Sequence, residues 1–306
     1  MNKTIHQWII SKDSLLNAIL DKDKKKIIRD ERIKSIINEL MNWPGTVLNS
    51  HKSAKQSFHK LEFLADIGLT YKDIPEIISK IKGNVSEEGP FVLPMNISEN
   101  YGGTGTDTLA WAICDAPSIT YSMAIMGLKN DNAVIKSLRY LAALIDNNGY
   151  RCKVSKELNP FRGPGRKDDP CPYATLIMLR LLNLYGDEFK KEIEICSECL
   201  LRLWVMSREE HPYMFYMGTD FRKLKAPLFW YDILNVVYIL SGNKKTCKDK
   251  RFISMLNEIY SKSYPDGKYK AESIYMSWKG WDFSEKKEPS AWITYYVEKI
   301  KERIEM

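Results

Sequence analysis

Apolar residues recur along this chain at the spacing of amphipathic helices, and the helices form pairs. In each pair, a strongly apolar first helix ends at a glycine, and a polar link leads to a second helix with charged positions at helical spacing. The pattern predicts first helices at 53–68, 115–127, 171–186 and 227–242. It predicts second helices at 73–85, 131–147, 188–206 and 248–263. The sequence therefore indicates an internal helical repeat.

Glycines and prolines mark the boundaries of this repeat. The first helices end, in order, at Gly68, Gly127, Gly186 and Gly242. The steps between these glycines are 59, 59 and 56 residues. We expect left-handed backbone at each of them, because that conformation commonly follows the last turn of a helix and only glycine adopts it without steric cost. The prolines expected to open first helices, where a missing amide is tolerated, are Pro117, Pro172, Pro227 and Pro289.

Further helices are expected at both ends of the chain. Helices near 5–20 and 30–42 form a divergent first unit, and 289–304 is the first helix of a unit that stops halfway. The first helices are apolar around their circumference, which is typical of buried helices, whereas the second helices carry a charged stripe that faces water. We therefore expect a single all-α domain, residues 1–306, with an inner and an outer layer of helices.

The two layers can curve as an open solenoid or close as a ring. An open solenoid needs a polar cap at each end. Here the leftover C-terminal helix can instead fill the gap beside the first unit, so we favour closure. Outside the helices, short extended pieces are expected in the connections 87–106 and 207–226.

Composition and charge place the chain among globular proteins. Its 306 residues are 44% hydrophobic, which is enough for a core and too much for a disordered chain. Lysine and arginine exceed aspartate and glutamate by 46 − 39 = 7, but the surplus is spread along the chain, so a nucleic-acid partner is not indicated. We expect neither a secretory signal nor a transmembrane segment, because the longest apolar stretch, 226–240, contains Asp232 and is too short to span a bilayer. The default expectation is a cytoplasmic protein.

Cysteine usage fits that expectation. Six cysteines are few for a chain of this length and do not form a dense disulfide framework. The only C-x-x-C motif, Cys196 and Cys199, falls in a helical pattern without a second Cys or His pair nearby. We therefore expect two buried thiols there and not a zinc or redox site.

The stretch 163-GPGRKDDPCPYATL-176 gathers charged residues, prolines and a cysteine ahead of an apolar run. One interpretation is helix initiation, in which Asp169 is an N-cap, the prolines occupy the first turn and Cys171 is simply a small apolar residue. The alternative is a ligand site. It would be formed by Arg166, Lys167, Asp169 and Cys171.

The helix pairs, their length and their turns with glycine and an aromatic residue resemble the α/α toroid of squalene and terpenoid cyclases and of protein prenyltransferase β subunits. The resemblance covers about residues 5–305 in architecture. It implies a closed ring of about five to six helix pairs around a central apolar pocket. The D-x-D-D acid motif of the cyclases is absent and the only Gln-Trp pair is Gln7–Trp8, so a protonation-type cyclase is not expected.

The stretch around residue 171 is more similar to the prenyltransferases, in which Gly-Arg precedes a lysine and Asp-x-Cys-Tyr begins an inner helix. The resemblance implies that Asp169 and Cys171 bind zinc. It also implies a diphosphate site formed by Arg166, Lys167 and Tyr173.

This chain departs from that motif in spacing and in one ligand. The basic residues lie closer to the aspartate than in the family, and Pro172 separates Cys171 from Tyr173. The family's third zinc ligand is a histidine at the start of an inner helix one repeat onward. Asp232 occupies that region here and could serve as an oxygen ligand, although Asp, Cys and Asp would be an unusual zinc set.

In a ring of helix pairs, the first turns of the inner helices surround one mouth of the central space. The acids at these positions, which are the candidate catalytic residues, are Asp115, Asp169 and Asp232. Helix capping also explains the first two. Asp232 lies inside an apolar run, where burial of a lone carboxylate is costly, so we expect it to face a cavity or to pair with a cation.

Aromatic residues near the same mouth are candidates for substrate binding. They are Trp230, Tyr231 and Tyr173, together with His211 from the connection 211–227. Aromatics with flanking cations could hold a prenyl chain and its phosphate, a base or a glycan. The structural alternative is a lid that packs its aromatics over the ring. His59, on the apolar helix 53–68, is expected to be a wall residue and not a ligand.

Two functions remain open. The first is an enzyme or binding protein that acts on a prenyl or other hydrophobic ligand; such an enzyme would be a transferase of the prenyltransferase type, with zinc as its cofactor. The second is a non-catalytic helical scaffold or binding protein of the same fold. The resemblance also implies a second, helical-repeat subunit as a partner, because protein prenyltransferases work with one.

Overall fold

The computed structural model describes residues 3–49, 53–158, 161, 163, 165, 166 and 168–305, and most of these are helical. Within this part of the chain the only strands are β1 (Leu93–Met95) and β2 (Thr108–Ala110), which pair antiparallel. β1 lies in the connection 87–106, where the sequence predicts an extended piece. The predicted all-α class is confirmed. None of the described helices is both long and apolar enough to cross a membrane.

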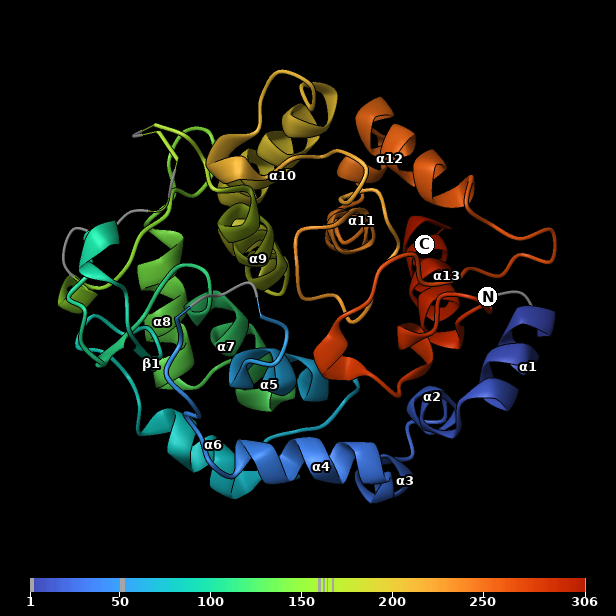
Figure 1. The fold of residues 1–306 in the computed structure, drawn as a ribbon, viewed down its shortest axis with the longest axis horizontal. Helices are drawn as coiled ribbons and strands as arrows, with labels where there is room; N and C mark the ends of the chain where they lie inside the picture. Colours follow the sequence, from blue (N-terminus) through green and yellow to red (C-terminus); the bar gives the residue numbers. More distant parts are fainter. Residues whose placement is uncertain are drawn as a thin grey trace.

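The helices lie in two sets around a common centre (Figure 1). Nearer the centre are α5 (Ser57–Asp66), α7 (Ala116–Met123), α9 (Pro172–Asn183), α11 (Ile233–Leu240) and α13 (Ala291–Glu305). Farther out are α4 (Glu31–Leu40), α6 (Pro75–Lys82), α8 (Asn132–Ala142), α10 (Lys190–Val205) and α12 (Lys250–Tyr260). The chain begins with α1 (Lys3–Lys12), α2 (Ser14–Leu20) and α3 (Lys24–Arg29). Each central helix packs against the next one in sequence, and α1 packs against α13.

Burial differs between the two sets as the hydrophobic pattern predicts. Every residue of α7 is buried, and in α9 every residue except Asn183 is buried. In α12, by contrast, burial is confined to Phe252, Met255, Leu256 and Ile259, which lie at helical spacing on one face. α7 and α9 therefore contact protein on all sides, whereas α12 contacts it on one.

The glycines at the ends of the first helices follow the prediction at three of four positions. Gly68, Gly127 and Gly186 have φ values of 94°, 104° and 54°, in the left-handed region. Gly242 does not have a positive φ. A Cβ atom there would lie 3.1 Å from Nδ2 of Asn183, so this glycine is explained by the close approach of the end of α9.

The prolines open two of the helices assigned to them. Pro117 and Pro172 lie in the first turns of α7 and α9, as predicted. Pro227 does not open a helix, because α11 begins only at Ile233. The backbone before that point pairs with another segment: the amide of Ile233 donates to the carbonyl of Phe221 at 2.8 Å.

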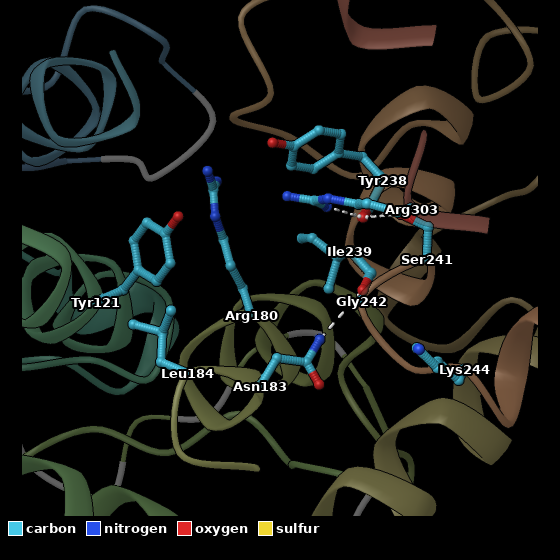
Figure 2. Close-up of a pocket in the computed structure, with 10 residues that line it drawn as sticks. All are labelled: Tyr121, Arg180, Asn183, Leu184, Tyr238, Ile239, Ser241, Gly242, Lys244 and Arg303. Atoms are coloured by element: carbon cyan, nitrogen blue, oxygen red, sulfur yellow. Dashed lines mark hydrogen bonds between the residues drawn. The ribbon is translucent and has the colours of Figure 1, made fainter. Parts of the chain in front are cut away.

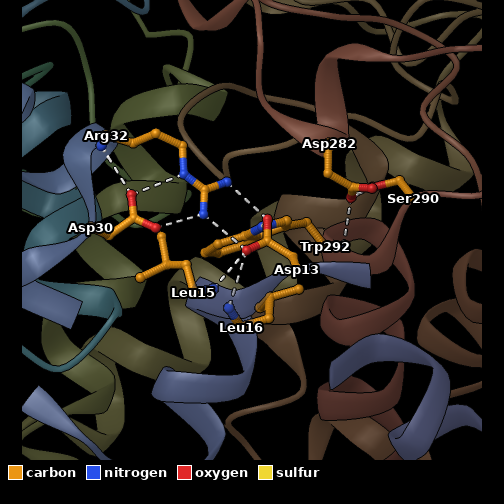
Figure 3. A network of polar contacts seen from close by, with 8 residues as sticks. All are labelled: Asp13, Leu15, Leu16, Asp30, Arg32, Asp282, Ser290 and Trp292. Carbon is orange, nitrogen blue, oxygen red and sulfur yellow. Dashed lines mark hydrogen bonds and ion pairs between the residues drawn. The ribbon is translucent and has the colours of Figure 1, made fainter. Parts of the chain in front are cut away.

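A buried carboxylate joins the start of the chain to its last helix (Figure 3). Asp13 is 6% exposed and caps α2 by accepting from the amide of Leu15 at 2.8 Å. Its two oxygens also accept from Arg32 at 2.9 and 3.0 Å, and Trp292 of α13 donates its indole N–H to Asp13 at 3.0 Å. Burial raises the pKa of Asp13, but the hydrogen bonds from Arg32 and Trp292 outweigh this effect and hold the pKa below its ordinary value.

The same tryptophan links α13 to the first central helix. Its ring lies 5.5 Å from that of Phe63 in α5 and 6.0 Å from that of Trp281. The guanidinium of Arg32 stacks over Trp281 at 4.7 Å. The last helix is therefore held against both the N-terminal helices and α5 by one contiguous set of contacts.

We expect Asp13→Ala to lower the free energy of unfolding by about 2–4 kcal/mol, because it removes a helix cap, leaves the Trp292 indole without its acceptor and leaves Arg32 with Asp30 as its remaining carboxylate partner. Urea denaturation measures this loss. Lys34→Ala is the control, because it breaks an exposed pair with Glu31 and should change stability by less than about 0.5 kcal/mol. Equal losses in the two variants would show that Asp13 does not hold the termini together.

Candidate functional site

A buried cluster of charges lies between the central helices. Arg180, in the apolar helix α9, is 6% exposed and donates to the carboxylates of Glu62 and Asp66, both from α5. It also donates to the carbonyl of Leu228 at 3.2 Å. Its guanidinium lies 4.4 Å from the ring centre of Tyr121, whose hydroxyl donates to Asp66 at 2.8 Å. These contacts tie α5, α7 and α9 together.

The charges of this cluster are set by burial and by one another. Burial raises the pKa of Glu62 to about 7, against the opposing effect of the Arg180 charge. Burial alone would lower the pKa of Arg180, but Asp66 and Glu62 hold it well above its ordinary value. The cluster therefore combines a permanent positive charge with two carboxyl groups, one of which titrates near neutral pH.

A cavity of about 340 Å³ opens beside Arg180 (Figure 2). Its walls come from α7 and from the C-terminal ends of α9, α11 and α13. The residues that line it are Tyr121, Arg180, Asn183, Leu184, Tyr238, Ile239, Ser241, Gly242, Lys244 and Arg303. Its volume lies in the range of small-molecule sites.

Two arginine–tyrosine stacks form facing walls of this cavity (Figure 2). One is Arg180 over Tyr121. The other is Arg303, whose guanidinium lies 3.9 Å from the ring centre of Tyr238 and donates to the Tyr238 carbonyl at 2.8 Å. Arg180 is neutralised by two carboxylates, whereas Arg303 has no carboxylate partner in the described part of the chain. The cavity thus contains one uncompensated guanidinium.

A second cavity of about 250 Å³ adjoins the first. The two share Asn183, Gly242 and Lys244 in their linings, so they lie side by side, and they are together called the groove below. The remaining lining residues of the second cavity are Gly186, Asp187, Lys190, Ile193, Glu194, Asn243 and Lys245.

None of the described residues predicted as site residues lines either cavity; Lys167 lies outside the described residues. Asp115, Cys171, Tyr173 and Asp232 lie at the first turns of central helices, whereas the cavity is at the opposite ends of α9, α11 and α13. The predicted capping roles also change. Cys171, and not Asp169, is the N-cap of α9, and its Sγ accepts from the amide of Ala174 at 3.5 Å.

The other acids of the predicted site make local contacts. Asp169 accepts from the backbone amide of Arg166, whose side chain is exposed, at 3.0 Å. Asp115 is fully buried before α7, and its carboxylate accepts from the amide of Ala112 at 3.3 Å without capping the helix. Both carboxylates therefore order the turns ahead of their helices.

The predicted aromatic residues pack on one another. Tyr173 and Trp230 have ring centres 4.3 Å apart, and Phe215 lies 5.7 Å from Trp230 and 5.3 Å from Tyr231. His211 is exposed and stacks on Tyr216 at 4.2 Å, apart from this group. Phe215 of the connection 211–227 thus packs against Tyr173 and Trp230, as the lid interpretation expects, whereas Tyr216 of the same connection is exposed.

Asp232 lines neither of the two cavities and makes no ion pair in the described part of the chain. It is 4% exposed and caps α11, with one oxygen accepting from the amide of Asn235 at 3.0 Å. Its other oxygen has no hydrogen-bond partner among the described residues. Burial raises its pKa to about 7, with a smaller opposing effect from the charge of Lys225. The interior position therefore favours the neutral acid of Asp232 below about pH 7.

The geometry gives no support to a metal centre. No group of three or more His, Cys, Asp or Glu residues in the described ranges could hold a metal ion, so a zinc set of Asp169, Cys171 and Asp232 stays a prediction from the resemblance. Cys114 donates to Cys171, and this hydrogen bond lowers the pKa of Cys171 although burial opposes the shift. Cys196 and Cys199 are both buried in α10.

The charged cluster can be recognised in the sequence by the position of its charges, although the residue types themselves are common. Arg180 is the single charged residue of the apolar segment 171–186, and Glu62 and Asp66 are four residues apart on the apolar first helix 53–68. A buried charge needs a partner of opposite sign. Charges of opposite sign on the apolar helices of two repeats therefore predict an ion pair between these repeats.

No protein-family model matches this chain, and a search of curated proteins finds no similar sequence.

We expect Arg180→Met to lower the free energy of unfolding by about 3–5 kcal/mol at pH 8, because Glu62 and Asp66 lose their buried partner. Adding Glu62→Gln should recover part of this loss, since it removes one uncompensated carboxylate. Urea denaturation of the single and double variants measures both effects. A double variant no more stable than Arg180→Met would contradict the role assigned to Glu62.

We expect Asp232→Asn to change how stability depends on pH. In the folded protein Asp232 keeps its proton up to a pKa of about 7, whereas the unfolded carboxyl loses it near its ordinary value of 3.8. Its contribution to stability therefore falls as pH rises from 5 to 8. Asparagine stays neutral. The free energy of unfolding of the variant, relative to that of the natural protein, should therefore increase by about 2–3 kcal/mol between pH 5 and pH 8.

Urea denaturation at pH 5 and pH 8 gives the difference, and Asp21→Asn at an exposed position is the control. A stability difference between Asp232→Asn and the natural protein that is the same at both pH values would refute the raised pKa.

Proposed function

We propose that this chain is an α/α toroid of the terpenoid cyclase and prenyltransferase type that binds a small molecule through an anionic group. The ligand site is the cavity between the Tyr121–Arg180 and Tyr238–Arg303 stacks. This is the binding-protein alternative of the sequence analysis, with a polar ligand in place of a prenyl chain.

The neighbour contacts of the central helices support the toroid. α5, α7, α9, α11 and α13 pack in sequence order, and the side chain of Trp292 brings α13 back to Phe63 of α5. Burial on all sides of α7 and α9 fits an inner layer, and the one-sided burial of α12 fits an outer layer.

The observation that carries the ligand proposal is Arg303. Its guanidinium lines the cavity, uses one N–H on the Tyr238 carbonyl and has no carboxylate among the described residues. The donors that remain have the fork geometry that suits a carboxylate or phosphate. In addition, Nε of Arg180, beside the cavity, has no acceptor among the described residues. Both observations favour a ligand with acceptor oxygens.

The prenyltransferase function stays a prediction. It needs a hydrophobic lumen and a metal near the first turns of the inner helices. There, Tyr173, Trp230, Phe215 and Tyr231 pack against one another, which supports a filled interior at that end.

Titration calorimetry with inorganic phosphate tests the binding proposal. We expect phosphate to bind the natural protein. Arg303→Gln should lower the affinity for phosphate at least tenfold, because a charge-assisted hydrogen bond is lost. Lys301→Gln is the matched control: it removes the same charge from the same helix, but Lys301 lines neither cavity and pairs with Glu298. No phosphate binding, or equal weakening by both variants, would overturn the proposal.

A further inference from the structure

The second cavity extends the proposed ligand site and differs from it in charge. Its lining contains the bases Lys190, Lys244 and Lys245 and the acids Asp187 and Glu194. Lys245 pairs with Glu194 at 2.9 Å. The lining is therefore close to neutral, unlike the arginine end of the groove.

Four polar groups in this lining keep hydrogen-bonding capacity. Asn183 donates its amide N–H to the carbonyl of Ile239 at 3.1 Å, which leaves its oxygen as an acceptor. Asn243 uses its oxygen to accept from the amide of Lys245 at 2.9 Å, which leaves its NH₂ as a donor. The side chains of Asp187 and Lys190 make no hydrogen bond or ion pair within the described ranges, although the charge of Lys190 helps to lower the pKa of Glu194.

These groups are two donors and two acceptors within one small cavity. A hydroxyl group both donates and accepts, so a polyhydroxylated segment can use all four. A second anionic group would be attracted by Lys190 and Lys244 but would face the Asp187 carboxylate. The two acceptors and two donors, with the Asp187 carboxylate among them, thus favour neutral hydroxyls over a second anion.

We infer that the natural ligand is a phosphorylated or carboxylated polyol, of which sugar phosphates are the model, with its anionic group at Arg303 and its hydroxyls in the second cavity. This inference rests on the proposed function, because the anionic end is the one that Arg303 binds. It adds the chemical class of the rest of the ligand and assigns its recognition to Asn183, Asp187, Lys190 and Asn243.

Titration calorimetry with inorganic phosphate, glycerol 3-phosphate and glucose 6-phosphate tests the inference. Affinity should rise along this series, with glucose 6-phosphate at least tenfold tighter than phosphate. Arg303→Gln should weaken all three. If no probe binds in an Arg303-dependent way, the proposed function and the inference both fail. If phosphate binds but the polyol phosphates bind no more tightly, only the inference fails.

The sign of the effect of Asp187→Ala separates hydroxyls from a second anion. Loss of an acceptor should lower the affinity for glucose 6-phosphate about fivefold or more and leave the affinity for inorganic phosphate unchanged. If the second cavity instead received an anion, removal of the carboxylate would tighten binding, and that result would overturn the inference. Glu188→Ala, at the next exposed position outside both cavities, is the control and should change neither ligand.

Discussion

The ion pairs of Arg180 with Glu62 and Asp66 are the constraint around which the centre of this molecule is arranged. A guanidinium in a helix that is otherwise apolar cannot be buried without acceptors, because its desolvation costs several kcal/mol. The acceptors come from α5, more than a hundred residues earlier in the chain. The polar requirement of Arg180 thus fixes α9 against α5, and Tyr121 fills the space between them.

The two ends of the central helices differ because different segments cover them. At the first turns, the connection before α11 packs Phe215, Trp230 and Tyr231 around Tyr173, and buried aromatic pairs of this kind add stability beyond their area. At the other ends of α9 and α11, the links begin with Leu184 and with Ser241. Leu184, Ser241 and Gly242 from these links line the first cavity, beside Arg180 of the charged cluster.

The sequence predicts the helices well and the site poorly, and the reason is physical. Helix periodicity is a local property, so the paired helices and their different burial follow from windows of a dozen residues. A cap depends on where a helix begins to within one or two residues, and here Cys171 and not Asp169 is the N-cap of α9. The charged cluster depends on repeats that meet in space, so the lone charge of Arg180 in an apolar segment does not by itself identify Glu62 and Asp66 as its partners. For Asp232 the sequence itself indicates that burial of a lone carboxylate is costly. The raised pKa of Asp232 reduces this cost, because the group can stay protonated in the interior.

The position of the groove also bears on the charge of its ligand. Helix C-terminal ends carry partial negative charge, which disfavours an anion by roughly 0.3–1 kcal/mol per helix within the last turn. Here the terminal carbonyls already have donors: Asn183 donates to Ile239, Lys129 to Leu184, and Arg303 to Tyr238. A charge-assisted hydrogen bond from an arginine contributes about 1.5–3 kcal/mol, which exceeds the remaining repulsion of one helix end. An anion can therefore bind at these ends, provided that Arg303 supplies the charge that the helices do not.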